Sequence, residues 1–301
     1  MATVNLPTLK QLRYLVALAE RGHFGHAAEA CFVTQSTLSA GLNELESLLG
    51  AVLVDRTKRR VVFTPLGHDI VAHARNVLAG AEDLALAAKA AQKPLAGPLR
   101  LGVIPTIGPF LLPRVLPRLR RTYPELRLYL KEDLTTRLCA QLADGQLDVV
   151  LLALPYPCGN VETTDLFDDH FRLACRADSA LGGELPVAAK TLKDETVLLL
   201  DEGHCLRAHA LSACRLPRRT EVDAFAATSL HTLVQMVANG LGVTLLPEMA
   251  IEAGILKGTG LVSREIEGER AFRRIGLAWR RGTRRRSEFE LLGRAITNAT
   301  K

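Results

Sequence analysis

Three short helix patterns, separated by sharp breaks, occupy the first fifty residues and constrain the fold more than any other feature. Apolar residues recur at spacings of three and four over Leu9–Ala19 and end near Gly22, and a shorter pattern covers Phe24–Cys31. A third pattern follows Thr34, whose side chain can cap the first free N–H groups, and ends at Gly50. Three short helices with a tight turn before the third predict a helix-turn-helix.

The start of the third helix and the segment after it carry groups suited to double-stranded DNA. Short polar side chains that can meet base edges or phosphates are Thr34, Gln35, Ser36, Thr37, Ser39 and Asn43. Two apolar strands within Leu53–Phe63 flank a basic tip, which indicates a wing. Its side chains that can neutralise phosphates are Arg56, Lys58, Arg59 and Arg60. A charge run is usually a solvated face, but its place after a helix-turn-helix favours a DNA contact.

A long helix pattern begins at Thr64-Pro65, with threonine as the cap and proline at the first helical position. Apolar residues alternate at four and three along it, at Ile70, Ala74, Val77, Ala81, Leu84, Ala88 and Ala91. This alternation predicts a coiled-coil seam that pairs two copies of the chain. The alternative is an amphipathic helix packed on its own domain. The Pro/Gly-containing segment 93–98 then predicts a hinge between domains.

These residues resemble the N-terminal domain of LysR-type transcriptional regulators. The motifs that carry the resemblance are Leu9–Ala19, Phe24, Ala27-Ala28, 33–39, 45–50, Arg56 and 63–67, and Ser36 stands where the family commonly has proline. The resemblance implies a winged helix-turn-helix DNA-binding domain over 1–64, a linker and dimerisation helix over 65–92, and a hinge at 93–98. It also implies promoter DNA as a partner, a homodimer through the linker helix that assembles into a homotetramer, and a contact with RNA polymerase.

From Leu99 onward, short apolar strand patterns alternate with helix patterns. The strands are expected at 99–104, 126–130, 149–154, 173–175, 197–200, 243–246 and 275–279, with helices at 110–122, 136–143 and 229–238 among others. Such alternation predicts a mostly parallel α/β sheet. The region resembles the LysR-type effector domain, which implies a periplasmic-binding-protein-like α/β architecture over 99–301. One subdomain would cover about 99–166 and 273–301, and the other about 167–270.

Composition and cysteine spacing exclude several classes of protein. No stretch resembles a membrane span, and the first nine residues lack the features of a signal peptide, so we expect a cytoplasmic protein without structural disulfides. The six cysteines form no CxxC pair and no cluster with metal-ligand spacing, so neither a metal nor a cofactor is expected. Cys139 and Cys175 are expected in the core, and the role of Cys158 is left open.

Cys205 and Cys214 lie nine residues apart and form a candidate redox pair. His204 and Arg207 place positive charge near Cys205, which favours the reactive thiolate, and Cys214 would be the resolving partner. If the span is helical, it separates the two residues by about 13.5 Å along the axis. A disulfide needs Cα atoms within about 7 Å, so the helix would have to unwind. On spacing alone, two incidental cysteines near a helix are an equal alternative.

Within the LysR-type family, the chain is most similar to the hydrogen-peroxide-sensing members. The motifs are 102–109, 199–207 with Gly203-His204-Cys205-Leu206-Arg207, Cys214, 227–230 and 244–247. This resemblance implies that peroxide oxidises Cys205 and that Cys214 resolves it. It also implies a peroxide pocket lined by Thr106, Thr135 and His204, with Arg207 and Arg273 acting on thiolate reactivity. Without it, Thr106 could simply cap a helix, His204 could be a loop histidine, and both arginines could form surface ion pairs.

Two other functions remain open at this stage. A LysR-type regulator could respond to a small metabolite, with both cysteines incidental, or a thiol peroxidase could turn over peroxide without any effect on DNA. The helix-turn-helix pattern argues against the enzyme, and persistence of both thiols after peroxide treatment would favour the metabolite.

Overall fold

A computed structural model describes residues 5–55, 61–90, 93–183, 186–214, 227–267 and 271–300. The chain divides into two compact units, Met1–Lys89 with Ala143–Gln146, and Ala90–Leu142 with Leu147–Lys301. Four basic residues of the predicted wing lie outside the described residues, namely Arg56, Lys58, Arg59 and Arg60. Each unit is therefore considered separately below.

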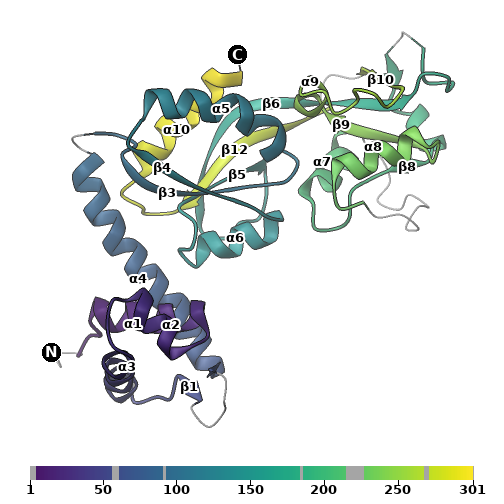
Figure 1. Ribbon diagram of the computed structural model, residues 1–301. Helices are drawn as coiled ribbons and strands as arrows, with labels where there is room; N and C mark the ends of the chain where they lie inside the picture. Colours follow the sequence, from purple (N-terminus) through teal and green to yellow (C-terminus); the bar gives the residue numbers. More distant parts are fainter. Residues whose placement is uncertain are drawn as a thin grey trace. The chain divides into compact units, whose positions relative to one another are not determined.

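The first unit begins with three helices whose ends are fixed by local capping (Figure 1). They are α1 (Leu9–Arg21), α2 (Phe24–Ala30) and α3 (Gln35–Leu49). The Thr34 hydroxyl accepts a hydrogen bond from the Thr37 N–H at 3.2 Å, as the sequence predicts for a cap. Gly22 and Gly50 end α1 and α3 with φ of 62° and 63°, left-handed values that glycine adopts at little cost. The predicted helix-turn-helix is confirmed.

A two-stranded antiparallel ribbon and a long helix complete this unit. The strands are β1 (Val54–Asp55) and β2 (Val62–Phe63), and the helix is α4 (Pro65–Ala90). Val71 and Ala74 of α4 are buried in the same core as Leu38 and Leu42 of α3. The first part of α4 therefore packs on its own domain. This was the alternative to the prediction that the whole helix forms a coiled-coil seam with a second copy. Further along α4, Val77 and Leu84 are 51% and 72% exposed.

The second unit is built on an eight-stranded sheet with the order β4-β3-β5-β12-β6-β9-β8, and β10 also pairs with β6. The strands are β3 (Gly97–Val103), β4 (Leu126–Glu132), β5 (Val149–Leu154), β6 (Val161–Arg176), β8 (Val197–Leu198), β9 (Val243–Pro247), β10 (Leu261–Arg264) and β12 (Phe272–Arg280). A separate parallel pair joins β7 (Val187–Ala188) to β11 (Ile266–Glu267). The sequence prediction of a mostly parallel sheet is wrong: β12 runs antiparallel to β5 and β6, and β6 runs antiparallel to β9 and β10.

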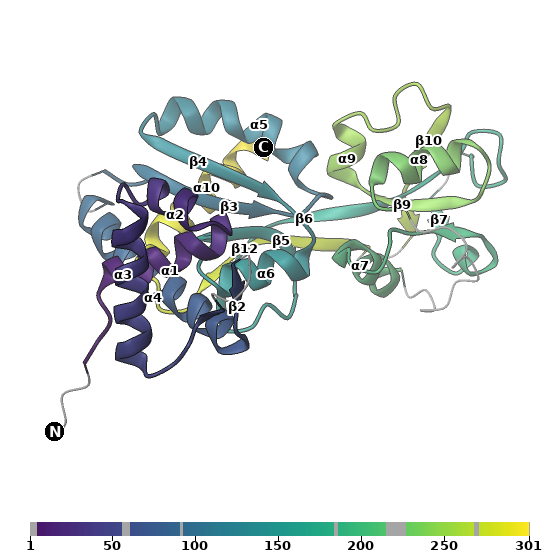
Figure 2. The ribbon, with the colours of Figure 1, turned by 60° about the horizontal axis from the view of Figure 1, so that its bottom comes forward.

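The long strand β6 extends through both halves of this unit (Figures 1 and 2). It pairs with β12 up to His170 and with β9 from Phe171 onward. The helices are α5 (Gly108–Thr122), α6 (Thr135–Ala143), α7 (Cys205–Ala213), α8 (Leu230–Ala238), α9 (Glu248–Glu252) and α10 (Arg286–Thr300), with the 3-10 helix η1 (Thr191–Asp194). In Figure 1, α5 and α10 lie on one face of the first half and α6 on the other, whereas α7 and α8 belong to the second half.

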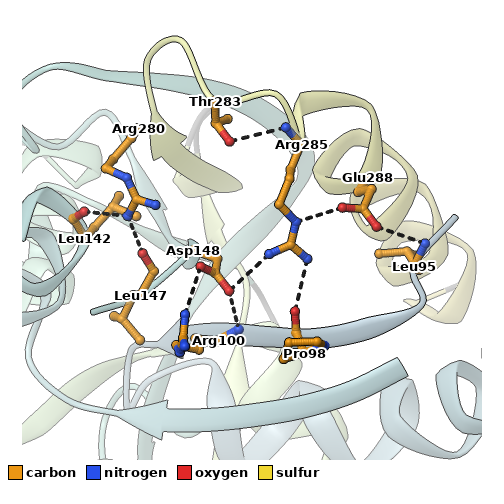
Figure 3. Close-up of polar contacts among 10 residues, drawn as sticks. All are labelled: Leu95, Pro98, Arg100, Leu142, Leu147, Asp148, Arg280, Thr283, Arg285 and Glu288. Carbon is orange, nitrogen blue, oxygen red and sulfur yellow. Dashed lines mark hydrogen bonds and ion pairs between the residues drawn. The ribbon is translucent and has the colours of Figure 1, made fainter. Parts of the chain in front are cut away.

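A buried ion-pair network anchors the start of this unit (Figure 3). The side chains of Asp148, Arg285 and Glu288 are each no more than 5% exposed. Arg285 contacts Asp148 at 3.3 Å and Glu288 at 2.7 Å, and Glu288 accepts a hydrogen bond from the Leu95 N–H at 3.1 Å. Arg285 also donates to the Pro98 carbonyl at 3.2 Å. Because buried charges are tolerated only when paired, these contacts fix the segment that enters β3.

Candidate functional site

Cys205 is the first residue of α7 and lies directly after the loop that follows β8. It is 6% exposed, and α7 begins at this point without a side-chain cap from His204. The thiol faces three other parts of the sequence: the start of α6 at Thr135, the end of β5 at Ala153, and β12 at Arg273. Residues up to 70 positions away thus define its surroundings.

Two opposing effects act on the Cys205 thiol. Burial raises its pKa, whereas hydrogen bonding to the Thr135 side chain, the positive charge of Arg273 and the backbone of Ala153 lower it. Burial outweighs the others, so the pKa of Cys205 is raised overall. The neighbours in sequence, His204 and Arg207, are not the groups that stabilise the thiolate, contrary to the electrostatic argument from the sequence.

Arg273 is held rigidly by two partners. Its guanidinium forms an ion pair with Asp169 at 2.9 Å, and the two side chains are 0% and 2% exposed. It also donates to the Thr106 hydroxyl at 2.7 Å and to the Thr106 carbonyl at 2.8 Å. Thr106 therefore does not cap α5, which begins without a side-chain cap. No local motif marks Asp169, because its pairing with Arg273 arises from the antiparallel register of β6 with β12.

His204 and Arg207 lie at the edge of the site. Both line a cavity of about 580 Å³ that also contacts Cys205 and Tyr156. Burial lowers the pKa of His204, which favours the neutral imidazole. Arg207 donates to the Leu200 carbonyl at 3.5 Å, so its contact is with the loop before α7. Of the predicted pocket residues, Thr135 and Arg273 act on the Cys205 thiol, and Thr106 is joined to it through Arg273. His204 and Arg207 border its cavity.

Cys214 ends α7 and lies on a different cavity. The span between the two cysteines is helical, as the sequence argument assumed, and both thiols are free. Cys214 lines a larger cavity of about 1280 Å³ together with His209, Lys190 and Arg274. Burial raises its pKa to about 11. Nine helical residues correspond to about 13.5 Å, so the two sulfurs can bond only after α7 unwinds.

The structure contains a disulfide that the sequence analysis did not expect. Cys139 and Cys158 are bonded, with their Cα atoms 5.1 Å apart, within the usual range of about 4.4–6.8 Å. The expectation of no structural disulfide did not anticipate this bond, whereas Cys139 lies in the core as expected, at 8% exposed. The spacing of 19 residues carries no recognisable motif, and the pair meets only because α6 packs beside the loop after β5. Cys175 is fully buried, as expected for the core.

The predicted DNA-facing side chains gather at the start of α3. Gln35, Ser36, Thr37 and Asn43 are exposed, and Ser39 is half-buried. Hydrogen bonds between the Thr34 hydroxyl and the hydroxyls of Ser36 and Thr37, at 2.9 and 2.8 Å, fix the orientation of this first turn. The helix thus presents short polar groups at its N-terminal end, where phosphates and base edges can be met.

Within the described residues, no group of three or more His, Cys, Asp or Glu side chains is arranged to hold a metal ion. None of the described helices combines the length and the apolar character that a bilayer crossing demands.

Comparison with known families adds to this geometry. Residues 9–68 match the bacterial regulatory helix-turn-helix protein of the lysR family, and residues 92–301 match the LysR substrate binding domain. The chain belongs to the LysR family. LysR-family relatives span nearly its whole length: the transcriptional regulator EstR of Acinetobacter baylyi is 43% identical over 95% of both chains. The dual regulator OxyR of Escherichia coli is 42% identical over 96% of this chain and 94% of its own.

Solved structures of LysR-family members resemble the fold as well. A full-length OxyR from Pseudomonas aeruginosa with a cysteine-to-aspartate substitution has a TM-score of 0.82 and 38% identity, covering 97% of this chain and 95% of the other. A peroxide-bound cysteine-to-serine variant of OxyR from Corynebacterium glutamicum has a TM-score of 0.69 and 36% identity, covering 99% and 94%. The LysR domain order predicted from the sequence is confirmed.

Proposed function

We propose that this LysR-family regulator senses hydrogen peroxide through Cys205, and that oxidation of Cys205 changes how the protein binds promoter DNA. One observation carries the proposal. Cys205 is a buried thiol whose pKa is raised by burial and lowered by the Thr135 side chain and the charge of Arg273. It lines a cavity of about 580 Å³ and begins the helix that separates it from Cys214. The similarity to OxyR proteins, one of them peroxide-bound, supports it.

The chemistry takes place in two balanced steps. The Cys205 thiolate attacks one peroxide oxygen, the O–O bond breaks, and hydroxide leaves and takes up a proton to become water. The sulfenic acid formed on Cys205 is then attacked by the Cys214 thiol, which forms the disulfide and releases a second water. The Thr135 and Thr106 hydroxyls can orient peroxide, and the Arg273 charge can stabilise the developing hydroxide.

The second step, disulfide formation, changes the conformation of α7. Because the helix α7 holds the two thiols on different cavities, closing the disulfide requires it to unwind. Hydrogen bonds from α7 to its surroundings, such as His209 to the Pro155 carbonyl at 3.2 Å, then break. We expect this rearrangement to alter the contacts between subunits and so the spacing of their DNA-binding domains.

The remaining parts of the proposal follow from the family. We expect promoter DNA to be bound through the start of α3, with Gln35, Ser36, Thr37, Ser39 and Asn43, and through the basic wing. The exposed stretch of α4 would form the dimer, and dimers would assemble into a homotetramer that contacts RNA polymerase. We expect a cytoplasmic protein that acts by binding rather than as an enzyme.

A peroxide titration of the purified full chain tests the proposal. Thiols are mapped by mass spectrometry, and DNA selected from random sequence by the reduced protein is footprinted before and after oxidation. We expect one Cys205–Cys214 disulfide per chain and a changed footprint. Cys205→Ser should hold the footprint in its reduced form, whereas Cys214→Ser should permit oxidation with a weakened or altered switch. Unchanged thiols and footprints after stoichiometric peroxide would refute it.

A second candidate is a regulator that responds to a small metabolite. The cavity of about 1280 Å³, lined by Lys190, Lys193 and Arg274 among others, is large enough for one. In that case, both thiols persist after peroxide treatment, and a metabolite alone changes the footprint. A thiol peroxidase would instead show many turnovers of peroxide with a dithiol reductant and no change in DNA binding.

A further inference from the structure

A second cysteine pair lies beside the candidate sensor. Cys139 belongs to α6, one turn after Thr135, and residues four apart on a helix share a face. Thr136, on the same helix, lines the cavity at Cys205 together with Tyr156. Burial raises the pKa of Cys205, and hydrogen bonding to the Thr135 side chain lowers it. Cys158 lies in the loop after β5, two residues beyond Tyr156, which lines the cavity at Cys205. The disulfide therefore joins the two segments that flank the sensor thiol.

Other contacts link the same two segments to α7. The Thr136 hydroxyl is hydrogen-bonded to the Tyr156 hydroxyl at 3.2 Å, parallel to the disulfide. The carbonyl of Pro155, in the same loop, is bonded to the His209 ring at 3.2 Å. Without the disulfide, the Thr136–Tyr156 hydrogen bond and the packing of Tyr156 on the core would still join the loop to α6.

The bond itself is buried, but the loop that carries Cys158 is open to solvent on both sides of that residue. Cys139 and Cys158 are 8% and 6% exposed and belong to the hydrophobic core, whereas Pro157 and Gly159 are exposed. A local opening of this exposed loop would bring the Cys158 sulfur to a small reductant.

We propose that Cys139–Cys158 is a second redox-active site, opened by a dithiol reductant, whose closed form positions Thr135 against the sensor thiol. This inference rests on the proposed function, because it assigns the bond an effect on the peroxide reaction of Cys205. Cys139 and Cys158 act as positioning residues, since neither touches the reacting sulfur.

Opening is a thiol–disulfide exchange. One thiolate of the dithiol attacks a sulfur of the disulfide and releases the first protein cysteine. The second thiol of the dithiol then attacks the reductant's own sulfur in the mixed disulfide and releases the other cysteine, so the protein gains two thiols and the reductant becomes a disulfide. On closing, one cysteine reduces hydrogen peroxide to water and becomes a sulfenic acid, and the other displaces a second water from it. The two cysteine pairs of the chain would then report on the same oxidant at different stages.

The first experiment titrates the bond itself. A Cys205→Ser, Cys214→Ser full chain is equilibrated with reduced and oxidised dithiothreitol in varying ratios, and the free thiols of Cys139 and Cys158 are counted by alkylation and mass spectrometry. We expect a reversible two-electron transition with unchanged far-ultraviolet circular dichroism. A bond that opens only when the protein unfolds would overturn the proposal.

The second experiment measures Cys205. The double variant Cys139→Ser, Cys158→Ser is compared with a matched control in which the remaining free cysteines are replaced, Cys31→Ser, Cys175→Ser. With the bond absent, we expect peroxide oxidation of Cys205 to slow about fivefold, the effect of one lost hydrogen bond. The alkylation rate of Cys205 by iodoacetamide, followed against pH, should show a raised pKa. Equal rates and equal pH profiles in both variants would overturn the proposal.

The proposal for Cys139–Cys158 can be tested even if Cys205 does not sense peroxide. Peroxide that leaves Cys205 of the intact chain unoxidised would refute the sensor function. The dithiothreitol titration and the alkylation profile use no peroxide, so they still test the role of the Cys139–Cys158 bond.

Discussion

At the scale of single residues, the reactivity of Cys205 is set by distant groups rather than by its neighbours in sequence. Burial raises its pKa, and the counteracting contributions come from Thr135, Arg273 and Ala153. Only the thiolate attacks peroxide. The groups that lower the pKa of Cys205 therefore increase its reactivity by stabilising the thiolate and the charge that develops on the leaving oxygen. The Arg273 charge is available because Asp169 and Thr106 hold it in a nearly dry site.

The hydroxyl of Thr135 provides the first prediction. Thr135→Val keeps the shape of the side chain but removes its hydrogen bond to the Cys205 thiol. We expect sulfenic acid formation to slow about fivefold, corresponding to one lost hydrogen bond. The rate is measured by trapping with dimedone in a Cys214→Ser background. Thr297→Val is the control, because its hydroxyl donates within α10 to Gly293 at 3.1 Å. Equal slowing in both variants would show that the hydroxyl has no special role.

The Cys214 thiol provides a prediction about pH. Its pKa is raised from 9.0 to about 11, so above pH 9 the unfolded chain releases a proton that the folded chain retains. The contribution of this difference to the free energy of unfolding is fully present below pH 9, because the thiol is then neutral in both states. It is lost as the pH rises toward 11, because the unfolded chain ionises first. We expect the free energy of unfolding to fall over this range by about 2 kcal/mol more in the natural chain than in Cys214→Ala. Anaerobic urea denaturation at several pH values measures it, and parallel curves would contradict it.

At the scale of elements, α7 is the part of the proposed switch that must change. It spans Cys205–Ala213, and its two ends contact different cavities. The sequence did not predict where α7 begins and ends. Its nine residues have mixed polarity, which fits several structures, so the sequence argument could only assume a helix. By contrast, α1, α3 and β5 could be predicted closely, because caps, glycines and apolar runs are local signals.

Weakening α7 tests whether it unwinds. Ala208 is an exposed residue within the helix, and Ala208→Gly costs about 1 kcal/mol of helix stability. We expect the Cys205–Cys214 disulfide to form up to about fivefold faster after the sulfenic acid, while the first oxidation keeps its rate. Time-resolved alkylation with mass spectrometry separates the two steps. The control is Ala85→Gly at an exposed position of α4. An unchanged second step would mean that closure does not require α7 to unwind.

At the scale of the whole molecule, the chain combines a DNA-binding unit with an α/β unit that carries Cys205 and Cys214. In the proposed function, oxidation of Cys205 affects DNA binding through the contacts between subunits, and α4 offers exposed apolar positions for such contacts. Val77 and Leu84 lie seven residues apart, two turns along one face, and are 51% and 72% exposed. Exposed large apolar side chains in such a row are typical of an interface.

A charge at this row should break the assembly. With Leu84→Asp, we expect sedimentation to show a loss of self-association of at least about tenfold, because a carboxylate would be buried without a partner. Binding to two-site DNA should weaken as well. Ala85→Asp is the control, since its exposed position lies about 100° around the helix. If Leu84→Asp sediments like the natural chain, the dimer forms elsewhere.

The sequence by itself determined the local features: the three helices, the two strands that flank the wing tip, the start of α4, and most strands of the α/β unit. These depend on caps, on glycine and on apolar periodicity within a few residues. That the span from Cys205 to Cys214 is helical was a condition of the sequence argument, which the structure met. The tertiary structure alone decided three others: the mixed strand directions, Arg273 with Asp169 as the charges near the thiol, and the Cys139–Cys158 bond. Each of these depends on which distant segments pack together, and such packing leaves no periodic signal in the chain.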